Sequence, residues 1–274
     1  MAEFTTNEVL RIENLCVSFG GLKAVDDLSF SVYEKEIFGL IGPNGAGKTT
    51  VFNCVTQFNK PDSGSIHFRT DAHRVSKGGE GDVTLNLVGR PVHSIIKLGL
   101  VRTFQNVEVI RELSLIDNVL IGAHIDFKAT VLEQALKLPR ARREERALRK
   151  KAEEALDFMG IADRKELPAG SQPYGVLKKV ELARTLMCDP KLIIMDEPAA
   201  GLNDTETDAL SHSIRSIRDT YQCTILLIEH DMHLVMNLCD RICAISFGKF
   251  LAVDVPDEIK KNKLVQEAYL GEED

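Results

Sequence analysis

The chain has 274 residues and a formal net charge of −7, with 44% hydrophobic and 27% charged residues. This composition is typical of a soluble globular protein with a sizeable core, and the acidic balance does not favour a nucleic-acid surface as main partner. No apolar run approaches the ~20 residues of a membrane span, and the N-terminus lacks the features of a signal peptide. A role at a membrane would therefore depend on another chain. The six scattered cysteines are typical of reduced thiols in the cytosol.

The first part of the chain combines strands with a glycine-rich loop. Alternating apolar residues predict strands at 9–19 and 28–32, which suggest an antiparallel layer. The apolar run 37–41 predicts a buried strand, and 51–55 can continue a helix. Between these two lies Gly42-Pro-Asn-Gly-Ala-Gly-Lys48-Thr49-Thr50. Strand, loop and helix in this order are the context of a phosphate-binding loop, or P-loop.

The P-loop residues offer the groups that bind the phosphates of a nucleotide. Its glycines let backbone N–H groups turn inward around an anion, and the N-terminus of the helix adds its dipole. Lys48 would reach the β- and γ-phosphates, and the Thr49 hydroxyl would hold Mg²⁺. We predict that the nucleotide is bound by Gly42, Asn44, Gly45, Ala46, Gly47, Lys48, Thr49 and Thr50.

A polar stretch at 70–82 separates two further predicted strands, at 65–68 and 83–88. We interpret this stretch as a mobile hairpin tip of low local stability. An insertion that contacts a partner is the alternative.

From 114 to about 186 the pattern is helical. A periodic segment at 130–138 is interrupted by Pro139, and a charged helix at 140–159 is stopped by Gly160. Glutamates are interleaved with the basic residues of the charged helix. This mixture favours a solvated helix face over a surface for lipid headgroups or nucleic acid.

Strands return in the last third, at 191–196, 223–229 and 242–247, with helices at 206–219 and 232–239 between them. Strand, helix and strand at this spacing predict a parallel sheet with crossover helices. The chain is thus expected to be an α/β nucleotide-binding core that carries an inserted helical subdomain.

Polar residues at the ends of these strands suggest hydrolysis of a phosphoanhydride. Asp196 ends its strand and can reach the Mg²⁺ shell, because ligands of open α/β sheets collect at the carboxyl ends of strands. Glu197 follows it and could polarise the attacking water. His230 ends the next strand, where an imidazole can hydrogen-bond the γ-phosphate and help to position Glu197. A metal pair of His230 with His233 is an alternative, although Mg²⁺ prefers oxygen ligands.

Gln105 lies at the junction between the predicted core and the helical region. Its amide could sense Mg²⁺ or the attacking water. Taken alone, it is better explained as a polar linker residue.

Together these motifs resemble those of the ATP-binding cassette (ABC) ATPases. The P-loop, Gln105, Tyr174-Gly175, Asp196-Glu197-Pro198 and His230 occur in the family's order, and the resemblance covers essentially the full chain. It is closest to the ATP-binding subunits of bacterial branched-chain amino-acid importers. The segments that carry the likeness are Phe19-Gly-Gly-Leu-Lys-Ala-Val, Arg102-Thr-Phe-Gln-Asn, Pro139-Arg-Ala-Arg-Arg-Glu-Glu-Arg, Pro198-Ala-Ala-Gly-Leu-Asn203, Ile228-Glu-His-Asp-Met232 and Ala268-Tyr-Leu-Gly-Glu272.

The resemblance implies an α/β fold with a P-loop NTPase (RecA-like) core, an antiparallel β subdomain and an inserted α-helical subdomain. The whole chain would be a single ABC nucleotide-binding domain. Its core and β subdomain would comprise residues 1–105 and 186–255, its helical signature subdomain 106–185, and its C-terminal tail 256–274.

The resemblance also implies a site for ATP and Mg²⁺. Phe19 would stack on the adenine. Thr49, Gln105 and Asp196 would hold the metal, and Gln105 would also couple the site to the helical subdomain. Glu197 and His230, with Gln105, would carry out catalysis.

Two cassettes would close head to tail around two ATP molecules. Each site would combine the P-loop of one cassette with the signature segment of the other, including its Gly175, and Asn203 would lie at that interface. The second cassette would be either identical or homologous.

The family further implies a peripheral position on the cytoplasmic face of the inner membrane. A short helix of a membrane-spanning permease would dock near Val107 to Asn118, and a periplasmic solute-binding protein would take part indirectly. The expected function is to bind and hydrolyse ATP and so power an importer for branched-chain amino acids or related small solutes. The alternatives are a soluble ABC ATPase acting on nucleic acid, ribosomes or cofactor assembly, and an ATP-binding scaffold that barely hydrolyses.

The signature segment departs from the family's Leu-Ser-Gly-Gly-Gln or Leu-Pro-Tyr-Gly-Gln, because it is Gln172-Pro173-Tyr174-Gly175-Val176. Pro173 offers the γ-phosphate neither a hydroxyl nor an N–H, and Val176 replaces an amide side chain. Gly175 and the following helix N-terminus retain a backbone anion site. We expect this chain to complete the opposite ATP site weakly, while its own P-loop site is intact. Ser171 could partly substitute by a shifted register.

Overall fold

A computed structural model describes residues 7–103, 108–126 and 138–270 of the chain. The chain divides into two compact units. The core unit comprises Met1–Arg102 and Lys191–Asp274, and the helical unit comprises Thr103–Pro190. The functional subdomains expected from the sequence, with limits at 105/106, 185/186 and 255/256, remain a prediction.

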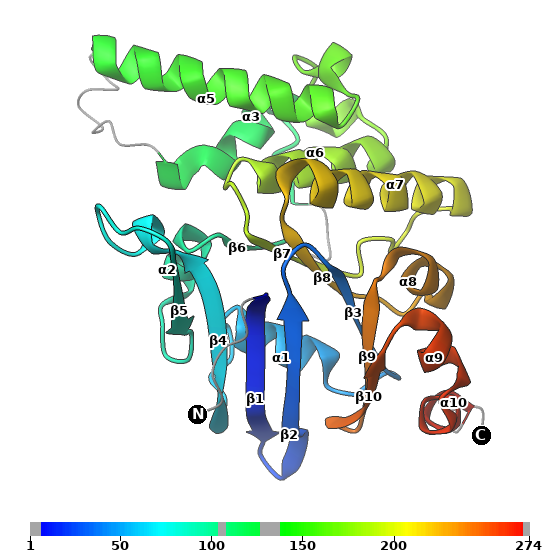
Figure 1. The fold of residues 1–274 in the computed structure, drawn as a ribbon. Helices are drawn as coiled ribbons and strands as arrows, with labels where there is room; N and C mark the ends of the chain where they lie inside the picture. The colour runs from blue at the N-terminus through cyan, green and yellow to red at the C-terminus, as the bar shows by residue number, and fades with distance from the viewer. Residues whose placement is uncertain (1–6, 104–107, 127–137, 271–274) are drawn as a thin grey trace. The chain divides into compact units, whose positions relative to one another are not determined.

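A six-stranded sheet forms the centre of the core unit (Figure 1). Its strand order is β10-β9-β3-β8-β7-β6, and all neighbours pair in parallel except β10, which is antiparallel to β9. The strands are β3 (Ile37–Ile41), β6 (Leu100–Arg102), β7 (Leu192–Asp196), β8 (Thr224–Ile228), β9 (Arg241–Ser246) and β10 (Lys249–Asp254). Every residue of β3, β7 and β8 is buried, as expected for central parallel strands covered on both faces. The predicted α/β fold is confirmed.

A four-stranded antiparallel sheet, in the order β2-β1-β4-β5, forms the second layer of the core unit. Its strands are β1 (Glu8–Phe19), β2 (Leu22–Tyr33), β4 (Ser63–Asp71) and β5 (Asp82–Asn86). Phe30 of this sheet stacks on Phe38 of the six-stranded sheet, with ring centroids 5.5 Å apart. A continuous hydrophobic core therefore joins the two sheets.

The polar stretch at 70–82 is shorter as a loop than the sequence suggested, because β4 and β5 extend into it. Asp71 pairs with Asp82 across the two strands. The buried Thr70 hydroxyl donates to the carbonyl of Leu98. The ammonium of Lys191 lies 3.5 Å from Asp71 and 3.0 Å from Asp82. The predicted tip is thus confined to the residues between these two aspartates, and its mobility remains a prediction.

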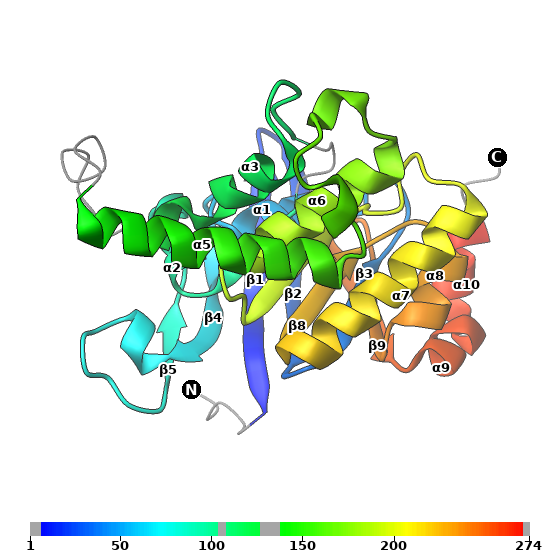
Figure 2. The ribbon, with the colours of Figure 1, turned by 90° about the horizontal axis from the view of Figure 1, so that it is seen from above.

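Helices of the core unit flank the six-stranded sheet. In both views of the ribbon α7 and α8 lie side by side (Figures 1 and 2). Asn203 and Glu206 form a reciprocal capping box that starts α7, which explains why this helix begins before the predicted residue 206. The helices are α1 (Lys48–Val55), α2 (Val92–Lys97), α7 (Asp204–Tyr221), α8 (Met232–Leu238), α9 (Pro256–Lys261) and α10 (Lys263–Leu270).

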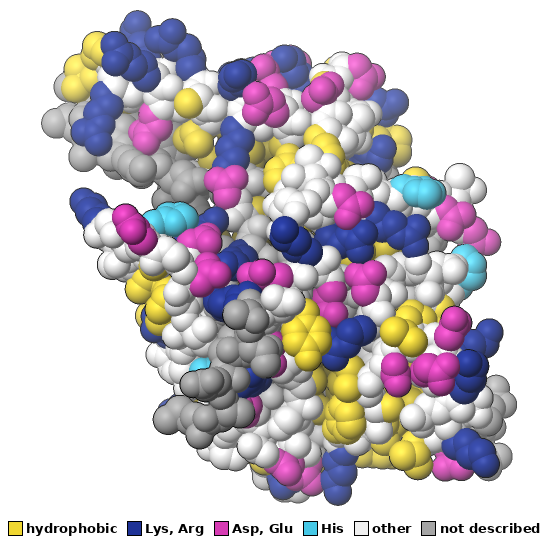
Figure 3. Space-filling model, in the orientation of Figure 1, with side chains coloured by type: hydrophobic (Ala, Val, Ile, Leu, Met, Phe, Trp, Pro, Cys, Tyr) yellow, Lys and Arg dark blue, Asp and Glu magenta, His cyan; other side chains and the backbone are white. Residues whose placement is uncertain are grey.

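The helical unit is built from α3 (Leu115–Leu120), α5 (Pro139–Phe158) and α6 (Tyr174–Leu186), each of which contacts the other two. Pro139 is the first residue of α5, where a missing N–H costs nothing, and Gly160 follows the helix with a φ of +67°. The helix predicted at 130–138 lies outside the described residues, except Leu138. Figure 3 shows Lys and Arg side chains gathered over one end of α5, with acidic side chains along the helix. None of the helices in the described ranges has the length and hydrophobicity needed to cross a membrane.

Candidate nucleotide site

The P-loop joins β3 to α1 in a conformation that only glycine permits at two positions. Gly47 has a φ of +98°, and a Cβ there would lie 2.4 Å from the carbonyl oxygen of Ala24. At Gly42, a Cβ would lie 2.2 Å from the carbonyl oxygen of Ile245. Gly45 also has a positive φ, +76°, but a Cβ there would meet nothing within 4 Å. The loop is therefore shaped by close backbone approach on two sides.

Lys48 and the start of α1 give this loop a positive character. The Lys48 side chain is 8% exposed, and its Nζ donates to the carbonyls of Gly42 and Pro43. The first i→i−4 hydrogen bond of α1 runs from Val51 N–H to Gly47 O, at 3.0 Å. The amides of the preceding first turn have no partner within a helix, and they carry the positive end of the helix dipole. This is the donor set that a polyphosphate requires.

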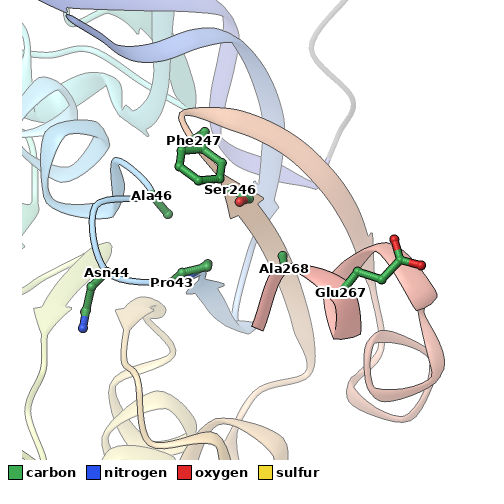
Figure 4. A pocket seen from close by; sticks show the side chains of 7 residues that line it. All are labelled: Pro43, Asn44, Ala46, Ser246, Phe247, Glu267 and Ala268. Carbon is green, nitrogen blue, oxygen red and sulfur yellow. The ribbon is translucent and has the colours of Figure 1, made fainter. Parts of the chain in front are cut away.

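The turn between β9 and β10 supports the outer side of the P-loop. Gly248 N–H donates to Ala46 O at 2.9 Å, and Phe247 beside it has a φ of +47° and a ring that is 86% exposed. A pocket of about 160 Å³ lies here, with Pro43, Asn44 and Ala46 on one side, and Ser246, Phe247 and the α10 residues Glu267 and Ala268 on the other (Figure 4).

Asp196 ends β7 as a buried carboxylate, 5% exposed. Burial raises its pKa above the ordinary 3.8, and Arg102, which donates from Nη2 to Oδ2 at 3.0 Å, opposes that rise. Arg102 is fixed in turn by a hydrogen bond to Asn53 Oδ1 at 2.8 Å and by the Phe52 ring, 5.1 Å from its guanidinium carbon. The position of the Asp196 carboxylate is thus fixed by its hydrogen bond to the permanently charged Arg102.

Glu197 and His230 lie close together at the same edge. The Nδ1 atom of His230 is 3.7 Å from Oε1 of Glu197 and 3.9 Å from Oε2 of Glu229. The His230 side chain is 62% exposed, and that of Glu197 is 27% exposed. Both groups are therefore accessible to a ligand and to water at the carboxyl ends of the strands.

The strand order explains why these residues meet. β8 lies between β3 and β7, so His230 after β8 lies between the P-loop after β3 and the two acids of β7. The registers pair Leu40 with Ile228 and Ile228 with Asp196, which aligns the three strand ends. The structure thus brings together Lys48, Asp196, Glu197 and His230.

The other predicted site residues are placed separately. Phe19 ends β1 and is 52% exposed, and Thr49 and Asn44 are exposed on the P-loop. Gln105 lies outside the described residues. His233, on α8, is exposed and its Nε2 lies 3.2 Å from Nδ2 of Asn237.

Comparison with known families identifies this arrangement. Residues 25–200, from β2 through the P-loop to the turn after Glu197, match the ABC transporter family. The chain belongs to that family. A second family, described as branched-chain amino acid ATP-binding cassette transporter, matches residues 251–274. As a member of the ABC family the chain is a nucleotide-binding cassette.

Individual relatives cover nearly the whole cassette. It is 41% identical, over 96% of its length and 98% of the relative, to the high-affinity branched-chain amino acid transport ATP-binding protein LivG of Escherichia coli strain K12. BraF of Pseudomonas aeruginosa, with the same description, is 40% identical over the same shares. An ATP-binding cassette of an ABC transporter, solved in its ADP conformation, superposes with a TM-score of 0.79 at 30% identity, covering 97% of this chain and all of that one.

The signature segment of the cassette lies in the helical unit. Pro173 is the N-cap of α6, and Tyr174 and Gly175 form its first turn, so the helix begins earlier than the sequence suggested. Val176 N–H already donates to Pro173 O at 3.0 Å. Ser171 Oγ donates to Pro168 O at 2.8 Å and accepts from Gln172 Nε2 at 3.0 Å. These contacts are compatible with the weak-signature hypothesis, namely that this chain completes the opposite ATP site weakly. The hypothesis remains a prediction.

Two residues of the cassette's site were missed from the sequence: Arg102 and Glu229. Arg102 lies in a segment that resembles the family, but its partner Asp196 is distant in sequence, so no local pattern indicates its role. Glu229 follows the apolar run of β8 as Asp196 ends that of β7, so the same signal, an acid at the carboxyl end of a buried strand, could have found it.

Proposed function

We propose that this cassette binds and hydrolyses Mg·ATP and so powers an ABC importer of branched-chain amino acids or related small solutes. One observation carries the proposal: the P-loop, Asp196, Glu197 and His230 meet at the carboxyl ends of three adjacent strands. The solute class is supported by two relatives that match 96% of the chain and are described as branched-chain amino acid transport ATP-binding proteins.

The residues of the site have three proposed roles in phosphoryl transfer to water: binding the phosphates, holding the metal and activating the water. Lys48 and the α1 amides would hold the phosphates, and Thr49, Gln105 and Asp196 would hold the metal. Bound Mg·ATP supplies the phosphoanhydride and a cation that neutralises charge as it develops. Glu197 orients and polarises a water, and His230 holds the γ-phosphate oxygens and keeps Glu197 in place. The half-exposed ring of Phe19 offers a face for the adenine.

Transport requires other chains. We propose a second cassette, identical or homologous, whose P-loop site is completed by Gly175 of this chain. We also propose a permease that docks near Val107 to Asn118 and changes conformation as the two cassettes close on ATP and part after hydrolysis. In that segment the buried Asn118 holds the loop before α3, because it bonds Ile110 N–H and Ile110 O at 2.8 and 3.0 Å. The complex would lie on the cytoplasmic face of the inner membrane and receive solute from a periplasmic binding protein.

The test is purification of the cassette from native membranes in mild detergent, followed by transport. We expect polytopic permeases and a second cassette to co-purify, and cells that lack the chain to lose leucine, isoleucine and valine uptake. Wild-type chain should restore uptake, whereas Glu197→Gln should not. Uptake of these amino acids that persists without the chain would overturn the assignment of branched-chain amino acids as solutes. Recovery with ribosomal or assembly proteins instead of permeases would overturn the importer.

A further inference from the structure

Glu229 is an almost fully buried carboxylate beside the candidate site, 1% exposed. Its Oε1 accepts the N–H of Ala199 at 2.9 Å. Its Oε2 accepts the N–H groups of His230 at 3.1 Å and Asp231 at 3.4 Å. One side chain thus bonds the turn that follows β7 and the loop that follows β8.

The turn that Glu229 holds is conformationally demanding. Glu197 has a φ of +46°, in the left-handed region that L-residues rarely adopt because it is strained. Its N–H donates to Ile228 O at 2.9 Å, and its carbonyl accepts from Ala200 N–H at 3.1 Å. The contact between Ala199 and Glu229 closes the other side of the turn, so Glu197 is held from both flanks.

A carboxylate suits this position better than an amide. Glu229 faces N–H donors at both oxygens, and only an ionised carboxyl accepts at both. Burial raises the pKa of Glu229, and the three N–H donors oppose that rise. A buried charge is costly unless hydrogen bonds compensate for its lost hydration, and the N–H groups of Ala199, His230 and Asp231 provide such bonds.

We propose that Glu229 is a positioning residue, which clamps the turn after Glu197 to the His230 loop and thereby fixes the spacing of these two groups. It acts through them and touches neither substrate nor metal. The inference rests on the proposed function for the roles of Glu197 and His230, but the clamp itself is a property of the nucleotide-free chain.

The test compares Glu229→Gln and Glu229→Asp with a matched control, Glu36→Gln. Glu36 is also a buried carboxylate, 8% exposed, that accepts a backbone N–H, from Tyr33 at 2.6 Å, and is paired with Arg241. It precedes β3 at the strand's amino end, whereas the P-loop follows the carboxyl end. Glu36→Gln therefore perturbs a buried carboxylate of the same unit away from the site.

Two readouts are needed. Amide hydrogen exchange of the nucleotide-free full chain should show the Ala199 amide exchanging at least about tenfold faster in Glu229→Gln, because a bond to a charged acceptor is lost. In the assembled ATPase, kcat should fall about tenfold or more while KM for ATP changes by less than about twofold. Glu229→Asp should lie between wild type and Glu229→Gln, and Glu36→Gln should match wild type in both readouts.

Unchanged exchange at Ala199 in Glu229→Gln would overturn the clamp, whatever the activity. A fall in kcat that Glu36→Gln shares, or that comes with an equal rise in KM, would overturn the positioning role. If Glu229→Gln does not fold, wild-type exchange at Ala199 in Glu229→Asp would be the contradicting result. A wild-type chain that hydrolyses no ATP would refute the proposed function, while the exchange comparison would still decide the clamp.

Discussion

The Nδ1 atom of His230 lies 3.7 Å from Oε1 of Glu197, although the two residues follow different strands. The order β3-β8-β7 produces this proximity, because the strand that carries His230 lies between the P-loop strand and the strand that carries the acids. An imidazole so placed could contact a bound phosphate and the carboxylate of Glu197, the proposed catalytic group, together.

His230→Ala should therefore lower kcat for ATP hydrolysis by about 100-fold, because a positioned donor to the transition state is lost. ATP affinity should change little, since Lys48 and the P-loop amides remain. The matched control is His233→Ala, an exposed histidine in the first turn of the helix that follows the His230 loop, which should keep wild-type kcat. Equal losses in both variants would favour a metal shared by the two histidines instead. Steady-state phosphate release measures both.

The P-loop glycines should differ in tolerance. Gly47→Ala places a Cβ 2.4 Å from the Ala24 carbonyl and should weaken ATP binding at least about tenfold, the equivalent of ~1.4 kcal/mol. Gly45→Ala meets no atom within 4 Å and should bind ATP more tightly than Gly47→Ala, although its positive φ carries some strain. Titration with a fluorescent ATP analogue distinguishes them. Equal affinities would contradict the backbone packing described here.

Two carboxylates, the buried Glu36 and the half-buried Asp26, should give opposite pH dependences of stability. Burial raises the pKa of Glu36 above its ordinary 4.5, so the folded state holds its proton more tightly than the unfolded state. Its contribution to the free energy of unfolding therefore falls as pH rises through the range above 4.5. Glu36→Gln should accordingly gain stability relative to wild type as pH rises above 4.5.

Asp26 provides the opposite case, because its hydrogen bond with Lys23 lowers its pKa below 3.8. Its contribution is present above 3.8 and is lost as pH falls, so Asp26→Asn should lose stability relative to wild type as pH rises. Urea unfolding at several pH values tests both substitutions. The same slope for the two variants would be inconsistent with these environments.

The signature segment makes a prediction about the partner's site. Pro173→Ser with Val176→Gln should raise the ATPase rate of the assembled complex by about threefold or more, equivalent to roughly 0.6 kcal/mol. The gain would come from a hydroxyl and an amide offered to the opposite γ-phosphate. Pro168→Ser, at a second proline that caps a short helix of the same unit, is the control and should leave the rate unchanged. An unaltered rate in the double variant would refute the weak-signature hypothesis.

Much of the fold follows from local patterns in the sequence. The runs Ile37–Ile41 and Leu192–Asp196 predict buried strands because each is apolar throughout, and the structure confirms them. β2 was predicted only from residue 28, because Lys23, Asp26 and Asp27 hide the first half of a strand that pairing with β1 stabilises. β10, α9 and α10 have only 6, 6 and 8 residues, too few for a pattern of apolar residues to stand out, so they were not predicted.

The site was predicted where chemistry is encoded in contiguous residues, as in the P-loop and in Asp196-Glu197. It was missed where the role depends on distant partners. Arg102 pairs with a residue 94 positions away, and Glu229 bonds an amide 30 positions away. Only the strand order brings these groups together, and no local pattern states that order.

Glu197→Gln tests the central claim most directly. The amide keeps the size of the side chain but cannot accept a proton from the attacking water, so hydrolysis should fall by about 100-fold or more while ATP still binds. The measurement is Mg²⁺-dependent phosphate release by the complete transporter, with ATP affinity determined in parallel. A large loss of kcat with preserved ATP affinity is the predicted result. A wild-type rate in Glu197→Gln would contradict the assignment of this edge of the sheet as the ATPase site.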